Sequence, residues 1–506
     1  MPVVTIEDPV PVRPPSVRWP LVTTCLVVFL AGLALRWWMV QSRYGGLNSD
    51  EAMTGLMGYD VLHGHPSLLV GANTYGGTLE AIVAAPVLAI FGASRLALKA
   101  MNASLWLVVW AALAWGLRPL LGRTRAVLVG AVTWVASGSM VLLSTMPYLG
   151  YASGLLFGVL SVGSLIRSIE GDRRARFASL AGLFAGLALW AHPLFLVLLM
   201  PAFAAGVWLR HRDQLSGWLI RIVVGAVVGA SPLILWNALN RGAGLSSPPQ
   251  LKVTTYSERL QLMTAQLIPR GLGLRIFDGG WLYPRRLGMA AVVTFLVLAI
   301  LGSLRLVRVQ RSGLILAASA VCAVPLLAAF PNTWFVEDGR YFEIILVPLL
   351  AGLMALTLPR VSRPHRLTPS RWGTLGLGAA VLFWGALSCG PWFRHEIPRT
   401  LINPDEQLTP LIDKLHAAGI QGIAGEYWAV YRVSFQSGRS IQAQVQDGPD
   451  RFARMHRFVE ALPPQQRAYL YFDWSDHPEL VPGKAATYER TLIAGFALYL
   501  PKADAP

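Results

Sequence analysis

Apolar stretches of near membrane-spanning length recur along most of the chain. They fall at residues 20–40, 97–117, 126–146, 150–167, 177–191, 193–209, 219–238, 287–304, 312–330, 342–358 and 373–391. A helix needs roughly 20 apolar residues to cross the hydrocarbon core of a bilayer, which is about 30 Å thick. The pattern therefore predicts an all-α polytopic membrane protein with about eleven transmembrane helices.

The composition agrees with a chain whose solvent is mostly lipid. Hydrophobic residues make up 54% of the sequence and charged residues only 14%, well below the roughly 25% charged residues of soluble domains. The net charge is +16, but the positive residues are dispersed among loops, so we expect no nucleic-acid partner. All three cysteines (Cys25, Cys322 and Cys389) fall within the apolar stretches, which leaves no disulfide framework.

The basic residues predict the orientation in the membrane. Arginines concentrate in alternate short loops, for example at residues 118–125, 167–176 and 210–221, and such loops remain cytoplasmic. The N-terminus is then inside and, after an odd number of spans, the C-terminus is outside. The apolar segment 78–92 must not cross for this to hold; it is short and carries Glu80 and Pro86, so we expect a helix in the outer interface.

Three regions follow from this topology. Residues 1–19 form a cytoplasmic leader, residues 20–391 form the transmembrane module with outer loops 41–96 and 239–286, and residues 392–506 form an extracytoplasmic domain. In that domain, residues 408–418 and 451–462 have helical periodicity, whereas 420–424, 468–472 and 491–500 are extended. This pattern predicts that the tail folds as a small α/β unit. The unit either recognises an acceptor, covers the membrane cavity or has a purely structural role.

Isolated acidic residues in the first outer loop are the strongest candidates for chemistry. Asp50 and Glu51 follow the first span by about ten residues, and Glu80 comes later in the same loop. Asn48 with Glu51 three residues on predicts a capped helix start, followed by an apolar stripe typical of an amphipathic helix on the membrane surface. Capping needs only one of the two acids, which favours a functional role for Asp50; Glu51 is equally well explained as a cap.

Cationic, aromatic and imidazole side chains on the same side of the membrane are candidates for binding an anionic substrate. The candidates are Lys252, Arg285, Arg286, Arg340, Tyr341, Tyr148, Tyr151 and His192. A guanidinium suits a phosphate oxygen pair, so Arg340 is the main candidate for a phosphate of a lipid carrier. Lipid headgroups, neighbouring acids and an interfacial aromatic belt are the alternatives for these residues.

Four sequence motifs resemble those of the GT-C superfamily of polytopic membrane glycosyltransferases. They are Asp50-Glu51-Ala52, Leu62-His63-Gly64-His65-Pro66, Tyr75-Gly76-Gly77-Thr78-Leu79-Glu80-Ala81 and Asp338-Gly339-Arg340-Tyr341-Phe342. The chain looks most like the bacterial branch related to protein O-mannosyltransferases and lipid A aminoarabinose transferases (glycosyltransferase family 39-like). The likeness covers residues 20–391 in layout.

This resemblance implies an inverting hexosyl- or pentosyltransferase in the cytoplasmic membrane. The donor would be a polyprenyl-phosphate sugar, and the acceptor a glycan, lipid or protein hydroxyl at the outer face. Asp50 would be the base, Glu80 would orient the acceptor or the base, and Glu51 would share either duty. Arg340, with Arg285, Arg286 or Lys252, would stabilise the departing phosphate. Some relatives use a divalent cation, for which Asp50, Glu80 and His192 are the candidate ligands here.

Two other classes of protein also fit a chain with many spans. A transporter or flippase of a lipid-linked saccharide is the main alternative, although transporters place polar sites near the midplane between internal repeats, and the spans here carry few ionisable groups. A sensor with an outer ligand-binding domain would leave the placement of Asp50 and Glu80 unexplained.

Overall fold

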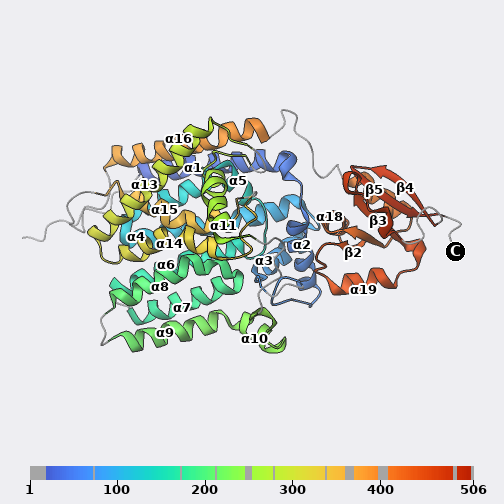
Figure 1. Ribbon diagram of the computed structural model, residues 1–506, viewed down its shortest axis with the longest axis horizontal. Helices are drawn as coiled ribbons and strands as arrows, with labels where there is room; N and C mark the ends of the chain where they lie inside the picture. Colours follow the sequence, from blue (N-terminus) through green and yellow to red (C-terminus); the bar gives the residue numbers. More distant parts are fainter. Residues whose placement is uncertain are drawn as a thin grey trace, which may run out of the picture.

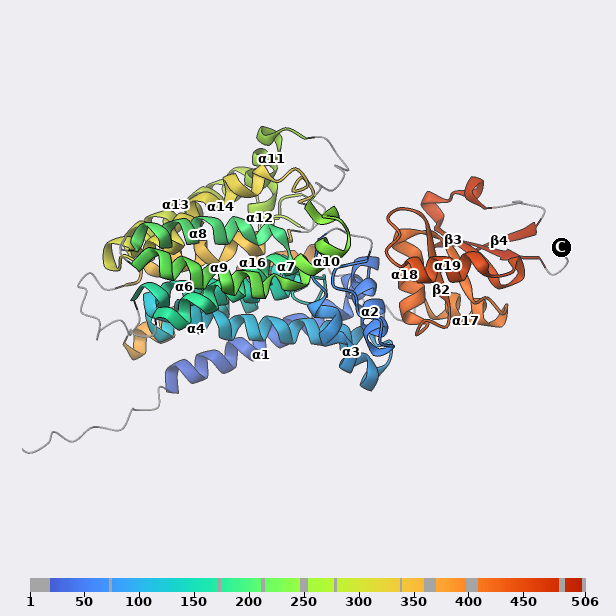
Figure 2. The same cartoon turned by 90° about the horizontal axis from the view of Figure 1, so that it is seen from below.

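The computed structural model describes residues 19–71, 75–170, 174–210, 214–245, 254–276, 280–336, 339–358, 370–396, 408–481 and 487–502. Its long axis runs from a bundle of helices to a small domain with a β-sheet at the C-terminal end of the chain (Figure 1). The helices α2 and α3 lie between these two parts, and the view from below shows the same order (Figure 2). The chain is therefore a multi-pass helical protein with an appended α/β domain.

The bundle contains helices of very different length. They are α1 (Trp19–Gln41), α2 (Ser49–Leu62), α3 (Leu79–Phe91), α4 (Arg95–Val135), α5 (Gly138–Leu143), α6 (Tyr151–Glu170), α7 (Arg174–Ala191), α8 (Leu196–Leu209), α9 (Leu215–Gly229), α10 (Ser231–Leu239), α11 (Tyr256–Leu262), α12 (Ile268–Gly271), α13 (Arg285–Val309), α14 (Gly313–Ala329), α15 (Phe342–Ala355) and α16 (Arg371–Glu396), with short 3-10 turns η1 (Arg43–Gly45), η2 (Pro193–Phe195) and η4 (Ala243–Leu245) and a π-turn η5 (Met263–Leu267).

The predicted number of membrane crossings is not confirmed. In the described part of the chain, five helices are long and apolar enough to cross, or six if the α9–α10 pair, bent by 60°, counts as one span. Four further apolar helices have only 10–17 residues, each with a proline inside it that does not end the helix. Three of them, Pro193–Leu209, Gly313–Ala329 and Phe342–Ala355, coincide with predicted spans but are shorter than a full crossing.

One element contains two helices that fold back on each other. Gly122, with φ 75°, interrupts α4, and the Trp110 indole nitrogen donates to the Val127 carbonyl at 2.9 Å. A straight helix would separate these two residues by about 25 Å, so the chain reverses at Gly122, where a residue without a Cβ tolerates positive φ. The predicted helices at 97–117 and 126–146 are therefore separate helices, the second of which ends early and is followed by α5.

Helix α2 begins as the sequence predicts but lies in different surroundings. Asn48 is its N-cap, and the Asn48 side chain and Glu51 form a reciprocal capping box. Ser49 and residues 51–58 are all buried, so the expectation of an amphipathic surface helix is wrong. The helix packs into one core with α3 and the C-terminal domain. A Cβ on Gly55 would lie 2.2 Å from the Phe435 ring, so this contact requires glycine.

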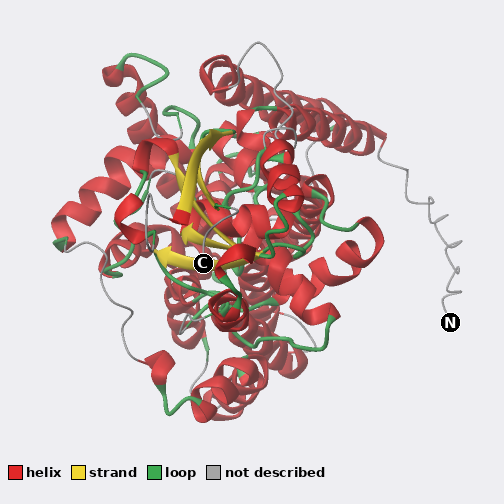
Figure 3. Ribbon diagram, turned by 90° about the vertical axis from the view of Figure 1, so that its right-hand side faces the viewer, coloured by secondary structure: helices red, strands yellow, loops and turns green. Residues whose placement is uncertain are grey.

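The C-terminal domain is a five-stranded mixed sheet with helices against it. It comprises α17 (Thr409–Ala417), β1 (Gly422–Glu426), α18 (Tyr427–Gln436), β2 (Gln442–Asp447), α19 (Ala453–Ala461), β3 (Arg467–Phe472), β4 (Tyr488–Ile493) and β5 (Phe496–Pro501), with the short turns η7 (Pro464–Gln466), η8 (Asp473–Ser475) and η9 (Pro478–Leu480). The strand order is β2-β1-β3-β5-β4, in which β1 pairs in parallel with β2 and β3, and β5 pairs antiparallel with β3 and β4. Viewed from its own side, the domain lies in front of the helical bundle (Figure 3).

The sequence predicts most of this domain but not all of it. The expected strand at 491–500 is instead the hairpin β4–β5, because Ala494 and Gly495 both adopt positive φ and turn the chain. Helix α18 and strand β2 were not expected. Helix α18 matters most, because it carries the contacts of the domain with α2.

Polar contacts fix the domain to α2 at both ends of that helix. The Ser49 hydroxyl donates to the Tyr427 carbonyl at 2.6 Å, and Arg439 pairs with Asp60 at 2.8 Å. Together with the shared apolar core, these contacts place the start of α18 directly against the first turn of α2.

Candidate active site

A cavity of about 130 Å³ lies where α2, the helical bundle and the C-terminal domain meet. The side chains around it are Asp50, Met53, Val70, Tyr75, Gly76, Tyr148, Leu149, Tyr151, His192, Arg340 and Arg451. Five of these are candidates from the sequence: Asp50, Tyr148, Tyr151, His192 and Arg340. Segments that are far apart in the chain therefore bring one carboxylate, one imidazole and two guanidinium groups into one small cavity.

Asp50 projects into this cavity from the first turn of α2. Its Oδ1 accepts a hydrogen bond of 2.5 Å from the hydroxyl of Tyr427, the first residue of α18. Burial, and then the neighbouring Asp50 charge, raise the pKa of Tyr427, so the phenol stays protonated and acts as the donor. Tyr427 thus fixes one carboxylate oxygen of Asp50 and leaves the other, Oδ2, for a further partner.

Arg340 presents the positive charge of the cavity against aromatic rings. Its guanidinium carbon lies 4.9 Å from the centre of the Tyr148 ring, 5.8 Å from Tyr151 and 5.5 Å from Phe335. Cations are attracted to aromatic faces at these distances. The hydroxyl of Tyr148 in turn accepts from the Asn48 side chain at 2.9 Å, so the N-cap of α2 also orients a ring that supports Arg340.

His192 lies at the break between α7 and η2, as the Pro193 junction predicts. Its Nδ1 accepts from the backbone N–H of Leu194 at 3.2 Å, and its ring contacts Tyr75 and Tyr151 at centroid distances of 5.5 and 5.0 Å. Desolvation and the Arg340 charge lower the pKa of His192 to about 3. The imidazole is therefore neutral at physiological pH and, because Nδ1 accepts, its proton is on Nε2.

Glu80 does not line the cavity but supports its wall. This buried carboxylate accepts from the backbone N–H groups of Gly150 and Ser153 at 3.0 and 2.9 Å, which are among the free donors at the start of α6. A carboxylate is favourable at a helix N-terminus. Glu80 thus holds the segment that carries Tyr148 and Tyr151.

Glu51 is fully buried and has structural partners. One oxygen accepts from Lys99 at 2.6 Å and the other accepts from the Asn48 backbone at 2.9 Å. Burial raises the pKa of Glu51, whereas Lys99 and Asn48 lower it. Of the three candidate acids in this segment, only Asp50 reaches the cavity.

The remaining candidates lie away from the cavity. Arg285 and Arg286 are exposed at the start of α13, and the hydroxyl of Tyr341 donates to the Asn332 carbonyl at 3.3 Å. None of these three lines the cavity. Lys252 falls outside the described residues.

Two of the three predicted metal ligands, Asp50 and His192, line the cavity, but Glu80 does not. Within the described ranges, no group of three or more His, Cys, Asp or Glu side chains could hold a metal ion. The Glu80 carboxylate is occupied by two backbone amides, and His192 uses Nδ1 for its own turn.

Sequence reasoning missed the contribution of the C-terminal domain. Tyr427 reaches Asp50 across 377 positions of sequence, and Arg451 lines the cavity from the segment before α19. Tyr427 belongs to the run Gly425-Glu426-Tyr427-Trp428, whose sequence has no catalytic spacing. Only the packing of α18 on α2 shows what Tyr427 does.

No protein-family model matches the sequence, and no curated protein matches it. Solved structures do match over nearly the whole chain. ArnT from Cupriavidus metallidurans, bound to undecaprenyl phosphate, is 12% identical with a TM-score of 0.62, covering 96% of this chain and 98% of ArnT. The oligosaccharyltransferase of Archaeoglobus fulgidus, in complex with Zn and sulfate, is 12% identical with a TM-score of 0.53, covering 96% of this chain and 74% of that protein.

The arabinofuranosyltransferase AftD from Mycobacteria is 16% identical with a TM-score of 0.53; the match covers 98% of this chain and 40% of AftD. All three are glycosyltransferases with the GT-C fold. The expected GT-C fold is thus confirmed for this chain.

The buried Glu51–Lys99 pair allows a test of whether Glu51 has a structural or a catalytic role. Glu51→Gln leaves the Lys99 ammonium buried without its carboxylate, which typically costs about 3–5 kcal/mol, so the melting temperature of the purified protein should fall clearly. The double variant Glu51→Gln/Lys99→Met should recover most of the loss, because it removes both charges. A Glu51→Gln protein that melts like the wild type would contradict the structural assignment.

Proposed function

We propose that this protein is an inverting glycosyltransferase that moves a sugar from a polyprenyl-phosphate carrier to an acceptor hydroxyl at the outer face of the cytoplasmic membrane. The observation that carries the proposal is the cavity in which the Asp50 carboxylate and the Arg340 guanidinium meet, in a chain with the fold of ArnT. ArnT was solved with undecaprenyl phosphate, which supports a lipid phosphate as the carrier here.

Asp50 is the proposed base. With Oδ1 held by Tyr427, its Oδ2 takes the proton of the acceptor hydroxyl. The acceptor oxygen then forms a bond to the anomeric carbon of the sugar, while the bond from that carbon to the phosphate oxygen breaks and its electron pair leaves with the phosphate. Attack opposite the leaving group inverts the anomeric centre. A polyprenyl phosphate leaves readily, so a strong general acid is not needed.

Arg340 and His192 are the proposed donors to the departing phosphate. The negative charge on the phosphate grows as the sugar leaves, and preorganised donors stabilise such charge most effectively in a site shielded from water. Three aromatic rings lie against the Arg340 guanidinium and orient it. His192 is neutral and donates through Nε2–H.

The outer location is part of the proposal. The distribution of arginines in short loops supports it. Asp50 and this domain lie together, so they must share one side of the membrane.

We predict that Asp50→Asn abolishes sugar transfer while the protein remains folded. Asparagine keeps an oxygen that accepts from Tyr427 and is a good residue near a helix start, so only the basic carboxylate is lost. Loss of a general base typically costs roughly 10²–10⁴-fold in rate. Transfer from a synthetic polyprenyl-phosphate sugar should be measured in purified, reconstituted protein.

Two variants serve as comparisons in this assay. Asp476→Asn changes a carboxylate that pairs with Arg490 and lines neither cavity, so its activity should match the wild type. Arg340→Lys keeps the charge but loses the two-pronged hydrogen bond, so transfer should weaken markedly. Asp50→Asn activity within a few-fold of the wild type would show that Asp50 is not the base.

The orientation can be tested with single cysteines in a background that lacks the three native ones. Ala417→Cys, at the exposed end of α17, should react with an impermeant thiol reagent in intact spheroplasts, because the domain is outside. Arg311→Cys, exposed between α13 and α14, should react only after lysis. The opposite pattern would reverse the topology and move the proposed site to the cytoplasm.

A further inference from the structure

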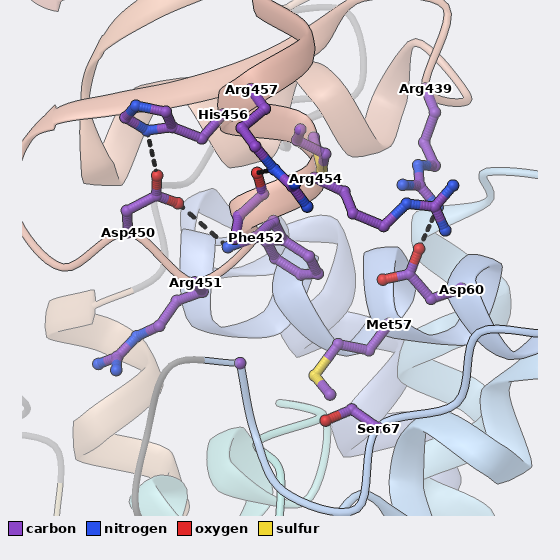
Figure 4. A pocket seen from close by; sticks show the side chains of 13 residues that line it. Met57, Asp60, Ser67, Arg439, Asp450, Arg451, Phe452, Arg454, His456 and Arg457 are labelled. Carbon is purple, nitrogen blue, oxygen red and sulfur yellow. Dashed lines mark hydrogen bonds and ion pairs between the residues drawn. The ribbon is translucent and has the colours of Figure 1, made fainter.

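A second and larger cavity lies beside the first, between α2 and the C-terminal domain. It has a volume of about 500 Å³, a size typical of ligand sites. Met57 and Asp60 of α2, with Ser67 and Gly71 of the following loop, form one wall. The opposite wall consists of Arg439 and residues 450–457, and Figure 4 shows these side chains around the shared space.

This cavity has an excess of positive charge. Four arginines (Arg439, Arg451, Arg454 and Arg457) face it, against two carboxylates, Asp60 and Asp450. Both carboxylates have partners in the protein. Asp60 pairs with Arg439 at 2.8 Å, whereas Asp450 is engaged by its own loop.

Asp450 holds together the loop before α19. It accepts from the Tyr431 hydroxyl at 2.9 Å and from the Phe452 backbone at 3.1 Å, and its second oxygen contacts His456 Nδ1 at 2.5 Å. The Asp450 carboxylate therefore uses its oxygens for Tyr431, Phe452 and His456, and among the described residues it forms no ion pair with the arginines of the cavity. In the part of the chain that the structure describes, Arg454 and Arg457 have no carboxylate within ion-pairing distance.

The two cavities follow one face of the same helix. Asp50 and Met53 line the small cavity, and Met57 and Asp60 line the large one. Residues at this spacing share a face of a helix, and ten residues at 1.5 Å each place Asp60 about 15 Å from Asp50. Arg451 lines both cavities, so the two cavities lie next to each other along α2.

We infer that the large cavity binds the acceptor, and that it selects an acceptor that carries a phosphate or carboxylate at a distance from the hydroxyl that reacts. This inference rests on the proposed transferase function. Arginine forks bind such oxyanions in a two-pronged manner, and a cleft that concentrates one sign of charge attracts the opposite sign. The acceptor lies along α2, with its anionic group at Arg454 and Arg457 and its hydroxyl at Asp50.

Binding of a phosphorylated sugar tests the inference directly. The full-length protein in phosphatidylcholine nanodiscs should bind maltose 1-phosphate at least tenfold more tightly than maltose, measured by titration calorimetry. Arg454→Gln/Arg457→Gln should remove this preference; both side chains are exposed, so the fold should be kept, as an unchanged melting temperature would verify. The matched control, Arg490→Gln, changes an exposed arginine of β4 that lines neither cavity and should keep the preference.

Equal binding of the two sugars, or an equal loss in Arg490→Gln, would overturn the inference. Nanodiscs containing phosphatidylglycerol distinguish a soluble or glycan-borne anion from a lipid headgroup. Maltose 1-phosphate should still bind in them, whereas its displacement by the anionic lipid through Arg454 and Arg457 would make the cavity a headgroup site and contradict the acceptor assignment.

The outcome is separable from that of the transferase proposal. Loss of the phosphate preference in a protein that still transfers sugar would reject only the acceptor assignment. A retained preference in a wild-type protein without transferase activity would reject the proposed function and leave only an anion-binding site in the large cavity.

Discussion

Helix α2 is held between the helical bundle and the C-terminal domain, and the geometry of the candidate site depends on this packing. On one side the Thr54 hydroxyl donates to the Pro147 carbonyl at 2.5 Å and Asn48 donates to Tyr148. On the other side Tyr427 donates to Asp50. A hydrogen bond to a charged group contributes roughly 1.5–3 kcal/mol to stability. The bond from Tyr427 is therefore strong enough to hold the Asp50 carboxylate in one orientation. The C-terminal domain thus completes the small cavity.

The three acids predicted as candidates, Asp50, Glu51 and Glu80, have different surroundings, and these surroundings separate their roles. Glu51 is buried against an ammonium and Glu80 is buried against two backbone amides, so both carboxylates use their oxygens within the protein. Asp50 is only partly buried and keeps one oxygen toward the cavity. The acids without access to the cavity shape it indirectly: Glu51 fixes the start of α2, and Glu80 fixes the segment with Tyr148 and Tyr151.

Local and periodic features of the sequence predict a large part of this arrangement. The capping box of Asn48 and Glu51 is local, and the structure confirms it. Asp50, His192 and Arg340 meet at one cavity, consistent with their assignment to the same side of the membrane. The pair of Glu51 with Lys99 was not predicted, because a buried charge pair across 48 positions leaves no periodic signal. Tyr427 was missed for a stronger reason: its role depends on how a separate domain packs, and Gly55 permits that packing only by lacking a side chain.

We propose that the cavity around Asp50 is where the bond between a sugar and a lipid phosphate breaks. The most direct measurement is the release of free polyprenyl phosphate when the reconstituted wild-type protein is given a polyprenyl-phosphate sugar and an acceptor. Polyprenyl phosphate should appear in step with the glycosylated acceptor, and Asp50→Asn should yield neither. Movement of the intact lipid-linked sugar across the liposome membrane without any release would contradict this proposal and would identify the protein as a flippase.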